Sequence, residues 1–308
     1  MNAVVSHRTG SRVPEGEATA ALVAGIGARL RESDRLVLPL EESLELLDRL
    51  REFELGRFLL HNQGLNGFWT AYIFRHPQGA PGSCPTEDWL LNRSLLSGAR
   101  ERFHRFKATI ARHVTDGAVL ASIPCGLMDD LLEQDYSGVR DVRVVGMDID
   151  PESLALAKEN AESRGLGALC EFGERDAWDL GRTAEFDLLV SNGLNMYESD
   201  PDRLRLLYRN FAQALKPGGS LLLSFLTPPP PPPWVDESRV QEWDKYGIEV
   251  ADLQRELALF GDIVQAKYLN FTPEAEVRQM LAEAGLVIES VDYSATGVLP
   301  IITARKPG

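Results

Sequence analysis

The sequence predicts an α/β fold in which an α-helical module precedes a mostly parallel β-sheet. Residues 22–114 carry apolar side chains at helical spacing and show no clear strand pattern. From residue 116 onward, short apolar runs alternate with helical segments, which is the pattern of βαβ units around a parallel sheet. At 308 residues the chain is long enough for a core of about 200 residues with an added module.

The first third of the chain is predicted to be helical. Residues 1–17 are small and polar, so we expect them to be disordered. Residues 18–115 form the predicted helical cap, in which the last two helices are expected at 86–97 and 98–113. The clearest amphipathic pattern of this module consists of Leu44, Leu47, Leu50, Phe53, Phe58 and Leu59.

Residues 116–308 contain the elements of the predicted sheet. Strands are expected at 118–124, 142–148, 168–172, 186–191 and 219–226. Helices are expected between them at 126–135, 151–164 and 201–215. A last helix at 273–284 leads to apolar runs at 286–293 and 298–304. Their short linker favours a hairpin, which would add an antiparallel strand at the edge of the sheet.

Six consecutive prolines at 228–233 interrupt this pattern, immediately before Trp234. Such a run adopts stiff polyproline II and cannot be a central strand. It follows the fifth expected strand, at the edge where ligands bind in open α/β sheets. Residues 228–250 are therefore interpreted as an insertion, either a spacer or a lid that carries Trp234, Trp243 and Tyr246 over a pocket.

Composition and charge exclude several classes of protein. The net charge is −14, which repels phosphate backbones, so nucleic acid is not an expected partner. The three cysteines form no CxxC pair, and this favours a reducing compartment. The N-terminus lacks the apolar core of a signal peptide, and no apolar run reaches membrane-spanning length. We expect a cytoplasmic protein without a membrane partner and, because its five histidines are scattered, without a metal site.

The segment from Val119 to Asp150 carries the strongest functional signal. Its first apolar run breaks at a tight Pro124-Cys125-Gly126 turn, and its second run ends on Asp148, 22 residues after Gly126. A strand, a turn, a helix and a second strand that ends on a carboxylate form a nucleotide-binding unit. The free N–H groups of the helix would face the ligand and the carboxylate would bind a ribose diol. The turn is not GxGxxG, however, which argues against a nicotinamide oxidoreductase.

Five ordered segments extend this pattern: LASIPCG, VVGMDIDPESLALAKENA, FGERDAWDL, FDLLVSNGLNMY and LKPGGSLLLSF. Together, residues 118–308 resemble the class I S-adenosylmethionine-dependent methyltransferases, which have a Rossmann-like seven-stranded, mostly parallel sheet with an antiparallel terminal hairpin. The helical module resembles the N-terminal cap of small-molecule methyltransferases. The resemblance implies S-adenosylmethionine as cofactor and S-adenosylhomocysteine as product.

The resemblance also implies roles for cofactor-binding residues. Asp148 would bind the ribose hydroxyls, Asp176 the exocyclic amine of adenine, and the Ala177 N–H a ring nitrogen. The other implied cofactor residues are Ser122, Pro124, Cys125, Gly126, Ile149 and Ser191. Three positions depart from the family pattern: Ser122 replaces an acid, and Pro124 and Met128 replace the first and third glycines. Asp129 or Asp130 could replace that acid, or could complement the helix dipole.

Catalysis by such an enzyme is largely alignment of a nucleophile with the methyl group. The candidate catalytic residues are Asn192, Asn195 and Tyr197, which follow the fourth expected strand, and His61 as a base. The candidate substrate-binding residues are Asn66, Trp69, Tyr72, Arg93 and Trp234. Arg75, Arg93 and Arg100 could hold a substrate carboxylate. Each of these residues also has an ordinary structural interpretation, as part of a hydrogen-bonded loop, a packed helix or a solvated surface.

The predicted function is transfer of a methyl group from S-adenosylmethionine to a small molecule, such as an amino acid or a specialised metabolite, at N, O, S or C. One alternative is methylation of a thioether such as methionine, which needs no base. Another is a non-catalytic S-adenosylmethionine-binding protein, suggested by the altered turn. A homodimer through the helical module is a further expectation.

Overall fold

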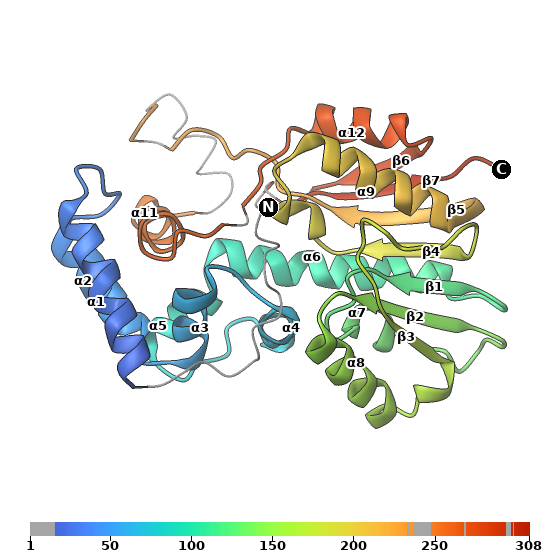
Figure 1. Cartoon of the computed structure of the whole chain (residues 1–308), viewed down its shortest axis with the longest axis horizontal. Coiled ribbons are helices and arrows are strands. Elements are labelled where there is room, and N and C mark those ends of the chain that lie inside the picture. The colour runs from blue at the N-terminus through green and yellow to red at the C-terminus, as the bar shows by residue number, and fades with distance from the viewer. Residues whose placement is uncertain (1–15, 233, 237–247, 268, 294–296, 298) are drawn as a thin grey trace.

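The computed structural model describes residues 16–232, 234–236, 248–267, 269–293, 297 and 299–308. It consists of a helical cap and a sheet covered by helices, which lie side by side (Figure 1). Of the segment expected to be disordered (1–17), residues 1–15 lie outside the described residues, as do Trp243 and Tyr246, whereas Glu17 already begins a helix. Every helix in the described part is too short or too polar to span a membrane.

The sheet has seven strands in the order β3-β2-β1-β4-β5-β7-β6. The strands are β1 (Val119–Ser122), β2 (Arg143–Asp148), β3 (Cys170–Glu174), β4 (Phe186–Ser191), β5 (Leu215–Ser224), β6 (Val287–Asp292) and β7 (Ile301–Arg305). The first five strands are parallel, whereas β7 pairs antiparallel with both β5 and β6. The hairpin expected from the sequence is present, and its reversed strand lies one position inside the edge.

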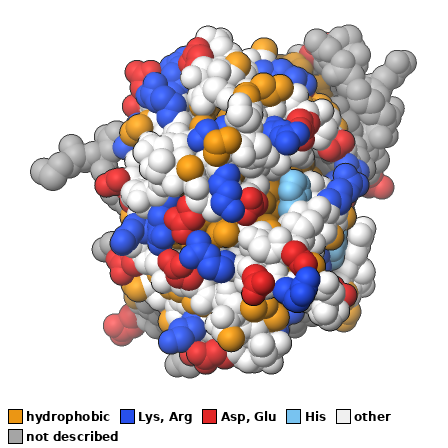
Figure 2. All heavy atoms as spheres, turned by 90° about the vertical axis from the view of Figure 1, so that its right-hand side faces the viewer, with side chains coloured by type: hydrophobic (Ala, Val, Ile, Leu, Met, Phe, Trp, Pro, Cys, Tyr) orange, Lys and Arg blue, Asp and Glu red, His pale blue; other side chains and the backbone are white. Residues whose placement is uncertain are grey.

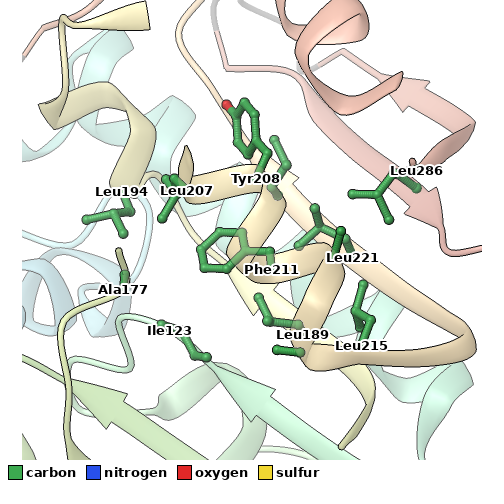
Figure 3. Packing of buried hydrophobic residues seen from close by; sticks show 14 of the residues in the cluster. Ile123, Ala177, Leu189, Leu194, Leu207, Tyr208, Phe211, Leu215, Leu221 and Leu286 are labelled. Atoms are coloured by element: carbon green, nitrogen blue, oxygen red, sulfur yellow. The ribbon is translucent and has the colours of Figure 1, made fainter. Parts of the chain in front are cut away.

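Helices cover both faces of the sheet because successive strand residues point to opposite faces. On one face, Leu189 and Leu221 pack against Leu207 and Phe211 (Figure 3). These two helical residues come from α9 (Pro201–Ala214), and α12 (Glu274–Glu283) packs beside it. On the other face lie α7 (Asp129–Leu132) and α8 (Pro151–Ser163). Two short 3-10 helices also occur: η1 (Ala111–His113) precedes β1, and η2 (Gly167–Leu169) precedes β3.

The cap is built from five helices and the first half of a sixth, and its core is separate from that of the sheet. They are α1 (Glu17–Glu32), α2 (Leu40–Leu50), α3 (Glu54–Asn62), α4 (Gly67–Arg75), α5 (Pro85–Leu91) and α6 (Ser94–Ile110). The expected division of the last two helices at residue 97 is wrong, because the chain breaks at Asn92 and Arg93 instead. Helix α6 continues from the cap to the sheet, where Phe106 and Ile110 are fully buried.

A segment that follows the proline run returns to the cap. It comprises α11 (Val250–Leu257) and the π-helix η5 (Ala258–Ile263), which lie among the cap helices in Figure 1. Leu259 and Ile263 are fully buried in the cap core. The buried Glu256 carboxylate accepts hydrogen bonds from the Ser94 N–H and hydroxyl, both at 2.8 Å, at the first residue of α6. The cap therefore contains two segments that are more than a hundred residues apart in the sequence.

The surface at the sheet end of the molecule carries charges of both signs. Figure 2 shows this face, on which basic and acidic side chains alternate over short distances. Near the amino ends of β2, β3 and β4, Arg182 pairs with Glu171 and Glu185, and Arg143 pairs with the same two acids. No continuous basic surface therefore covers the described part of this face.

Candidate functional site

A cavity of about 770 Å³ lies between the cap and the carboxyl ends of β1, β2 and β4. The core contributes the turn after β1, the end of β2 and the segment after β4. The cap contributes residues of α3, α4, α6 and η5. Eight of the expected cofactor residues line it: Ser122, Pro124, Cys125, Gly126, Asp148, Ile149, Asp176 and Ala177. Ser191 is buried at the end of β4 and is not among the lining residues.

The turn after β1 is held by backbone hydrogen bonds to both neighbouring strands. The Ile123 N–H donates to the Val190 carbonyl at 2.9 Å, and the Cys125 N–H to the Met147 carbonyl at 2.8 Å. Gly126 and Met128 have φ angles of 50° and 58°, which a right-handed helix cannot include. The helix expected at 126–135 is therefore wrong in length, because only Asp129–Leu132 is helical. Backbone groups of the turn, rather than a full helix, face the cavity here.

The structure explains how Met128 can stand where the family has a glycine. Its backbone adopts the left-handed conformation that glycine favours, at φ 58°. Its side chain is 1% exposed and packs over Gly146 in β2. A Cβ added to Gly146 would lie 2.9 Å from the Met128 sulfur and 3.0 Å from Phe172 Cδ1. The missing side chain at residue 146 thus creates the space that the methionine fills.

Asp148 ends β2 as expected and is almost completely buried. Its Oδ2 accepts from the Gly126 N–H at 2.9 Å and its Oδ1 from the Asp150 N–H at 3.1 Å. Burial raises the pKa of Asp148 to about 6, although these hydrogen bonds lower it in part. A carboxylate has about four acceptor positions, so these hydrogen bonds leave room for a ligand hydroxyl.

Asp130 lies against Ser122, the position at which the family pattern has an acid. The Ser122 hydroxyl donates to Asp130 Oδ2 at 2.9 Å, and both residues are buried in the cavity wall. Desolvation raises the pKa of Asp130 to about 6. Asp129, the other candidate, is instead engaged by Arg75, whose Nε and Nη2 donate to its two oxygens at 2.7 Å. Asp130 is therefore the acid at the carboxyl end of β1 that a cation can approach.

The four candidate catalytic residues separate into two pairs. Asn192 and Tyr197 line the cavity, and Asn192 Oδ1 is buried without a hydrogen-bond partner among the described residues. Asn195 turns away, because its Nδ2 donates to the Tyr208 hydroxyl at 2.9 Å. His61 lies outside this cavity, where its Nε2 is 2.9 Å from the Thr19 hydroxyl. Burial lowers the pKa of His61.

Of the five candidate substrate residues, only Asn66 lines the cavity. Trp69 is buried in the cap core, and the Tyr72 hydroxyl donates to Glu87 at 3.2 Å. Arg93 pairs with Asp252 of α11, and Trp234 is 40% exposed outside the cavity wall. Packing and side-chain pairing therefore account for Trp69, Tyr72 and Arg93, as in their structural interpretation.

The sequence did not indicate Arg102, which lies on the cavity wall and is 6% exposed. Its Nη1 donates to Ser224 Oγ at 3.2 Å and lies 3.6 Å from the Met196 sulfur. Burial lowers its pKa to about 10, so it stays a cation at neutral pH. Arg102 continues an apolar stripe of α6 with Leu95, Ala99 and Phe106 at helical spacing, and an ionisable residue in such a stripe was the available signal.

The cap and the turn are in direct contact. A Cβ on Gly67, the first residue of α4, would lie 3.0 Å from Gly126 Cα and 2.5 Å from Ser153 Oγ. Asn66 precedes it as the helix cap, with its side chain accepting from the Trp69 N–H at 3.0 Å. The close approach places the start of α4 against the turn that carries Gly126. The ion pair between Arg75 and Asp129 joins the far end of α4 to the core.

Known proteins resemble this chain in sequence and structure. A family profile for a methyltransferase domain matches residues 125–219. The structure of a possible exported protein from Bordetella parapertussis is 37% identical, with 94% of this chain and 96% of that chain covered and a TM-score of 0.86. Magnesium protoporphyrin IX methyltransferase from Synechocystis PCC 6803, solved with bound SAH, is 13% identical with 78% and 94% covered. Its TM-score of 0.51 reflects a shared fold alone.

Ribosomal protein L11 methyltransferase from Burkholderia multivorans is 40% identical over 81 residues. This region is 26% of the chain and only 23% of the length of that relative. The sheet order, the reversed β7 and the carboxylate at the end of β2 define a Rossmann-like nucleotide-binding protein. Residues 125–219 match the methyltransferase domain, and the chain has the fold of the class I S-adenosylmethionine-dependent methyltransferases, whose cofactor is S-adenosylmethionine.

Proposed function

We propose that the protein transfers the methyl group of S-adenosylmethionine to a small molecule and releases S-adenosylhomocysteine. One observation carries this proposal: the residues suited to the cofactor and the apolar residues of the cap line the same cavity. Asp148 and Asp176 stand on the core side, whereas Leu59, Phe74 and Phe260 stand on the cap side. A cofactor held by the core would therefore direct its methyl group toward a space bounded by the cap.

The charged groups of the cavity suit the parts of this cofactor. Asp148 would accept from the ribose hydroxyls through its unused acceptor positions. Asp130 would accept from the amino group of the methionine portion, in place of the acid that Ser122 replaces. Asp176 accepts one backbone N–H through Oδ1, from Trp178 at 2.9 Å, so Oδ2 would accept from the adenine amine. The Ala177 N–H and the Ile149 side chain would complete the adenine contacts.

Bound S-adenosylmethionine supplies an electrophilic methyl carbon on a sulfonium, so the protein needs mainly to align the acceptor. Asn192 Oδ1 has no partner among the described residues and would accept a hydrogen bond from the acceptor. Tyr197 lines the same wall and would orient the acceptor from its other side. The apolar side chains of the cap would exclude water from the methyl-transfer site. Because His61 lies outside the cavity, a base is not assigned to it.

The size and the walls of the cavity support a small acceptor. The cap stands over the carboxyl ends of the strands, where a large protein substrate would otherwise approach. A thioether acceptor, which has no proton to lose, fits the absence of a histidine from the described cavity wall. A cytoplasmic location and a homodimer through the cap remain predictions. Gel filtration with light scattering would measure the oligomeric state.

The test is transfer of label from methyl-labelled S-adenosylmethionine into a metabolite extract. We expect labelled small molecules with the wild-type protein and none with Asp148→Ala, which also loses affinity for S-adenosylhomocysteine in calorimetry. Asp116→Ala changes an exposed carboxylate that precedes β1 and does not line the cavity, so it is the matched control and should behave like wild type. Cofactor binding without any labelled product would favour a non-catalytic binding protein, and label only in protein would refute the small acceptor.

A further inference from the structure

Arg102 has an unpaired hydrogen-bonding edge inside the cavity. Its three nitrogens can donate five N–H groups, but its only hydrogen bonds to described residues leave through Nη1. Nε is buried without a partner, and no carboxylate of the described part of the chain pairs with this guanidinium. Arg75 uses the same Nε and Nη2 edge to bind both oxygens of Asp129. The edge that binds a carboxylate in Arg75 is thus free in Arg102.

A buried unpaired cation is costly for the protein. An isolated charge loses its hydration on burial, and buried arginines are usually paired. The other cations on the described cavity wall, Arg175, Arg203 and Lys267, are exposed. Arg203 also pairs with Glu198. Arg102 is therefore the cavity cation for which a bound anion would supply the missing partner.

The position of Arg102 favours the acceptor over the cofactor. Its contacts are Ser224, the last residue of β5, and Met196 in η3 (Leu194–Tyr197) after β4. Strands lie about 4.8 Å apart, so the end of β5 is about 10 Å from β1 and farther from β2, where Asp130 and Asp148 stand. The surrounding side chains form a small apolar cluster of Met196, Leu226 and Leu299, with Ala99, Tyr197 and Leu269 beside it.

From these contacts we propose that the acceptor is an apolar small molecule with a carboxylate, which pairs with the Nε and Nη2 edge of Arg102 and remains unmethylated. This inference rests on the proposed methyl transfer and names its substrate class. A guanidinium fork binds a carboxylate with two parallel hydrogen bonds, so it would fix the orientation of the molecule as well as its charge. The apolar cluster would hold the rest of the acceptor, and the atom that receives the methyl group would lie toward β4.

The test compares a carboxylic acid with its neutral counterpart on the protein saturated with S-adenosylhomocysteine. The probes are 4-phenylbutyrate and 4-phenylbutan-1-ol, titrated by NMR into wild type, Arg102→Gln and Arg102→Lys. We expect wild type to bind the acid about 10- to 100-fold more tightly than the alcohol. Arg102→Gln should bind both equally, and Arg102→Lys should keep part of the preference. Equal binding in wild type, no binding of the acid, or a preference that survives in Arg102→Gln overturns the proposal.

Further measurements separate the acceptor from the cofactor and from the fold. Affinity for S-adenosylhomocysteine should be the same in wild type and Arg102→Gln. If that variant loses this affinity but keeps affinity for 5′-methylthioadenosine, which lacks the carboxylate, Arg102 serves the cofactor and the proposal is wrong. The unfolding temperature of Arg102→Gln should equal or exceed that of wild type, because the buried charge is gone. If Arg102 served only the structure, its replacement would lower the unfolding temperature. If wild type labels no component of the extract, the proposed methyl transfer fails. The preference of the protein for the acid over the alcohol would still be measured independently of that result.

Labelled products of the extract give an independent readout. The proposal expects products that an anion-exchange column retains at pH 7 and that keep their label in mild base. A labelled methyl ester, which releases labelled methanol in base, would show that the carboxylate is the nucleophile and would overturn the anchoring role.

Discussion

Replacing Asp148 by asparagine should change how the stability of the unliganded protein depends on pH. Burial raises the pKa of this carboxyl from 3.8 to about 6. A shift of about two units corresponds to about 3 kcal/mol of folding free energy. Because the folded pKa is the higher one, this stability is present below pH 4 and is lost as the pH rises through 6. About 2 kcal/mol of the loss falls between pH 4.5 and 7.5.

The measurement is urea-induced unfolding of the unliganded protein at pH 4.5 and pH 7.5. Between pH 4.5 and pH 7.5, we expect the unfolding free energy of Asp148→Asn to rise by about 2 kcal/mol relative to that of wild type. The absolute stability is less informative, because the new amide can accept from only one of the Gly126 and Asp150 N–H groups. Asp116→Asn, at an exposed ion pair, is the control and should change stability by less than about 0.5 kcal/mol at both values.

Cofactor binding should respond in the opposite direction. Ribose hydroxyls donate to the ionised carboxylate, so wild-type affinity for S-adenosylhomocysteine should increase as the pH rises through about 6. Asp148→Asn should bind about 10-fold or more weakly at pH 7.5 and lose much of this dependence. If the unfolding free energy of wild type and of Asp148→Asn changes equally with pH, Asp148 does not carry a buried charge. If the two proteins also bind S-adenosylhomocysteine equally tightly, the contact with the ribose is refuted.

Three further variants test the surroundings of the cofactor turn. Gly67→Ala should weaken S-adenosylhomocysteine binding and lower the unfolding temperature, because its Cβ would be 2.5 Å from Ser153 Oγ. Gly25→Ala, in an open position of α1, should instead stabilise by about 0.5–1 kcal/mol in the same thermal assay. Asp130→Asn should weaken S-adenosylhomocysteine but not 5′-methylthioadenosine in calorimetry, and equal losses would exclude the amino-group contact. Gly146→Ala should cost about 1–3 kcal/mol in urea unfolding by overpacking Met128, and an unchanged midpoint would show that the sulfur moves freely.

The sheet could be predicted because its signals are local. Each parallel strand is a short apolar run, and Asp150 with Pro151 fixes the start of α8 by capping and by a preset φ angle. The site residues at strand ends followed from the same pattern, since Asp148 must lie where β2 ends. The turn was harder, because its glycine pattern is incomplete. The left-handed φ of Met128 depends on the space above Gly146, and these two residues are 18 positions apart in the sequence.

The sequence did not predict which segments complete the cap core or which cap residues face the cavity. A helical pattern shows that one face of α3 or α4 is buried, but not what covers it. The cap core is completed by Leu259 and Ile263, which follow the proline run and the expected lid. Arg93 seemed suited to a substrate carboxylate, yet α11 brings Asp252 against it. Arg102 faces the cavity because α6 continues into the sheet and fixes its rotation through Phe106 and Ile110.

The charges of the cavity show why the unliganded protein is not at its most stable. Asp148 is a buried acid at the end of β2, and Asp130 of α7 is a buried acid beside the end of β1. Arg102 of α6 is a buried cation beside the end of β5. No direct pairing between the two ends is present among the described residues, so each group bears its own desolvation cost. Selection for stability alone would remove such groups. Their separation instead matches a cationic cofactor at one end and an anionic acceptor at the other, with Asn192 directly after β4, the strand between them.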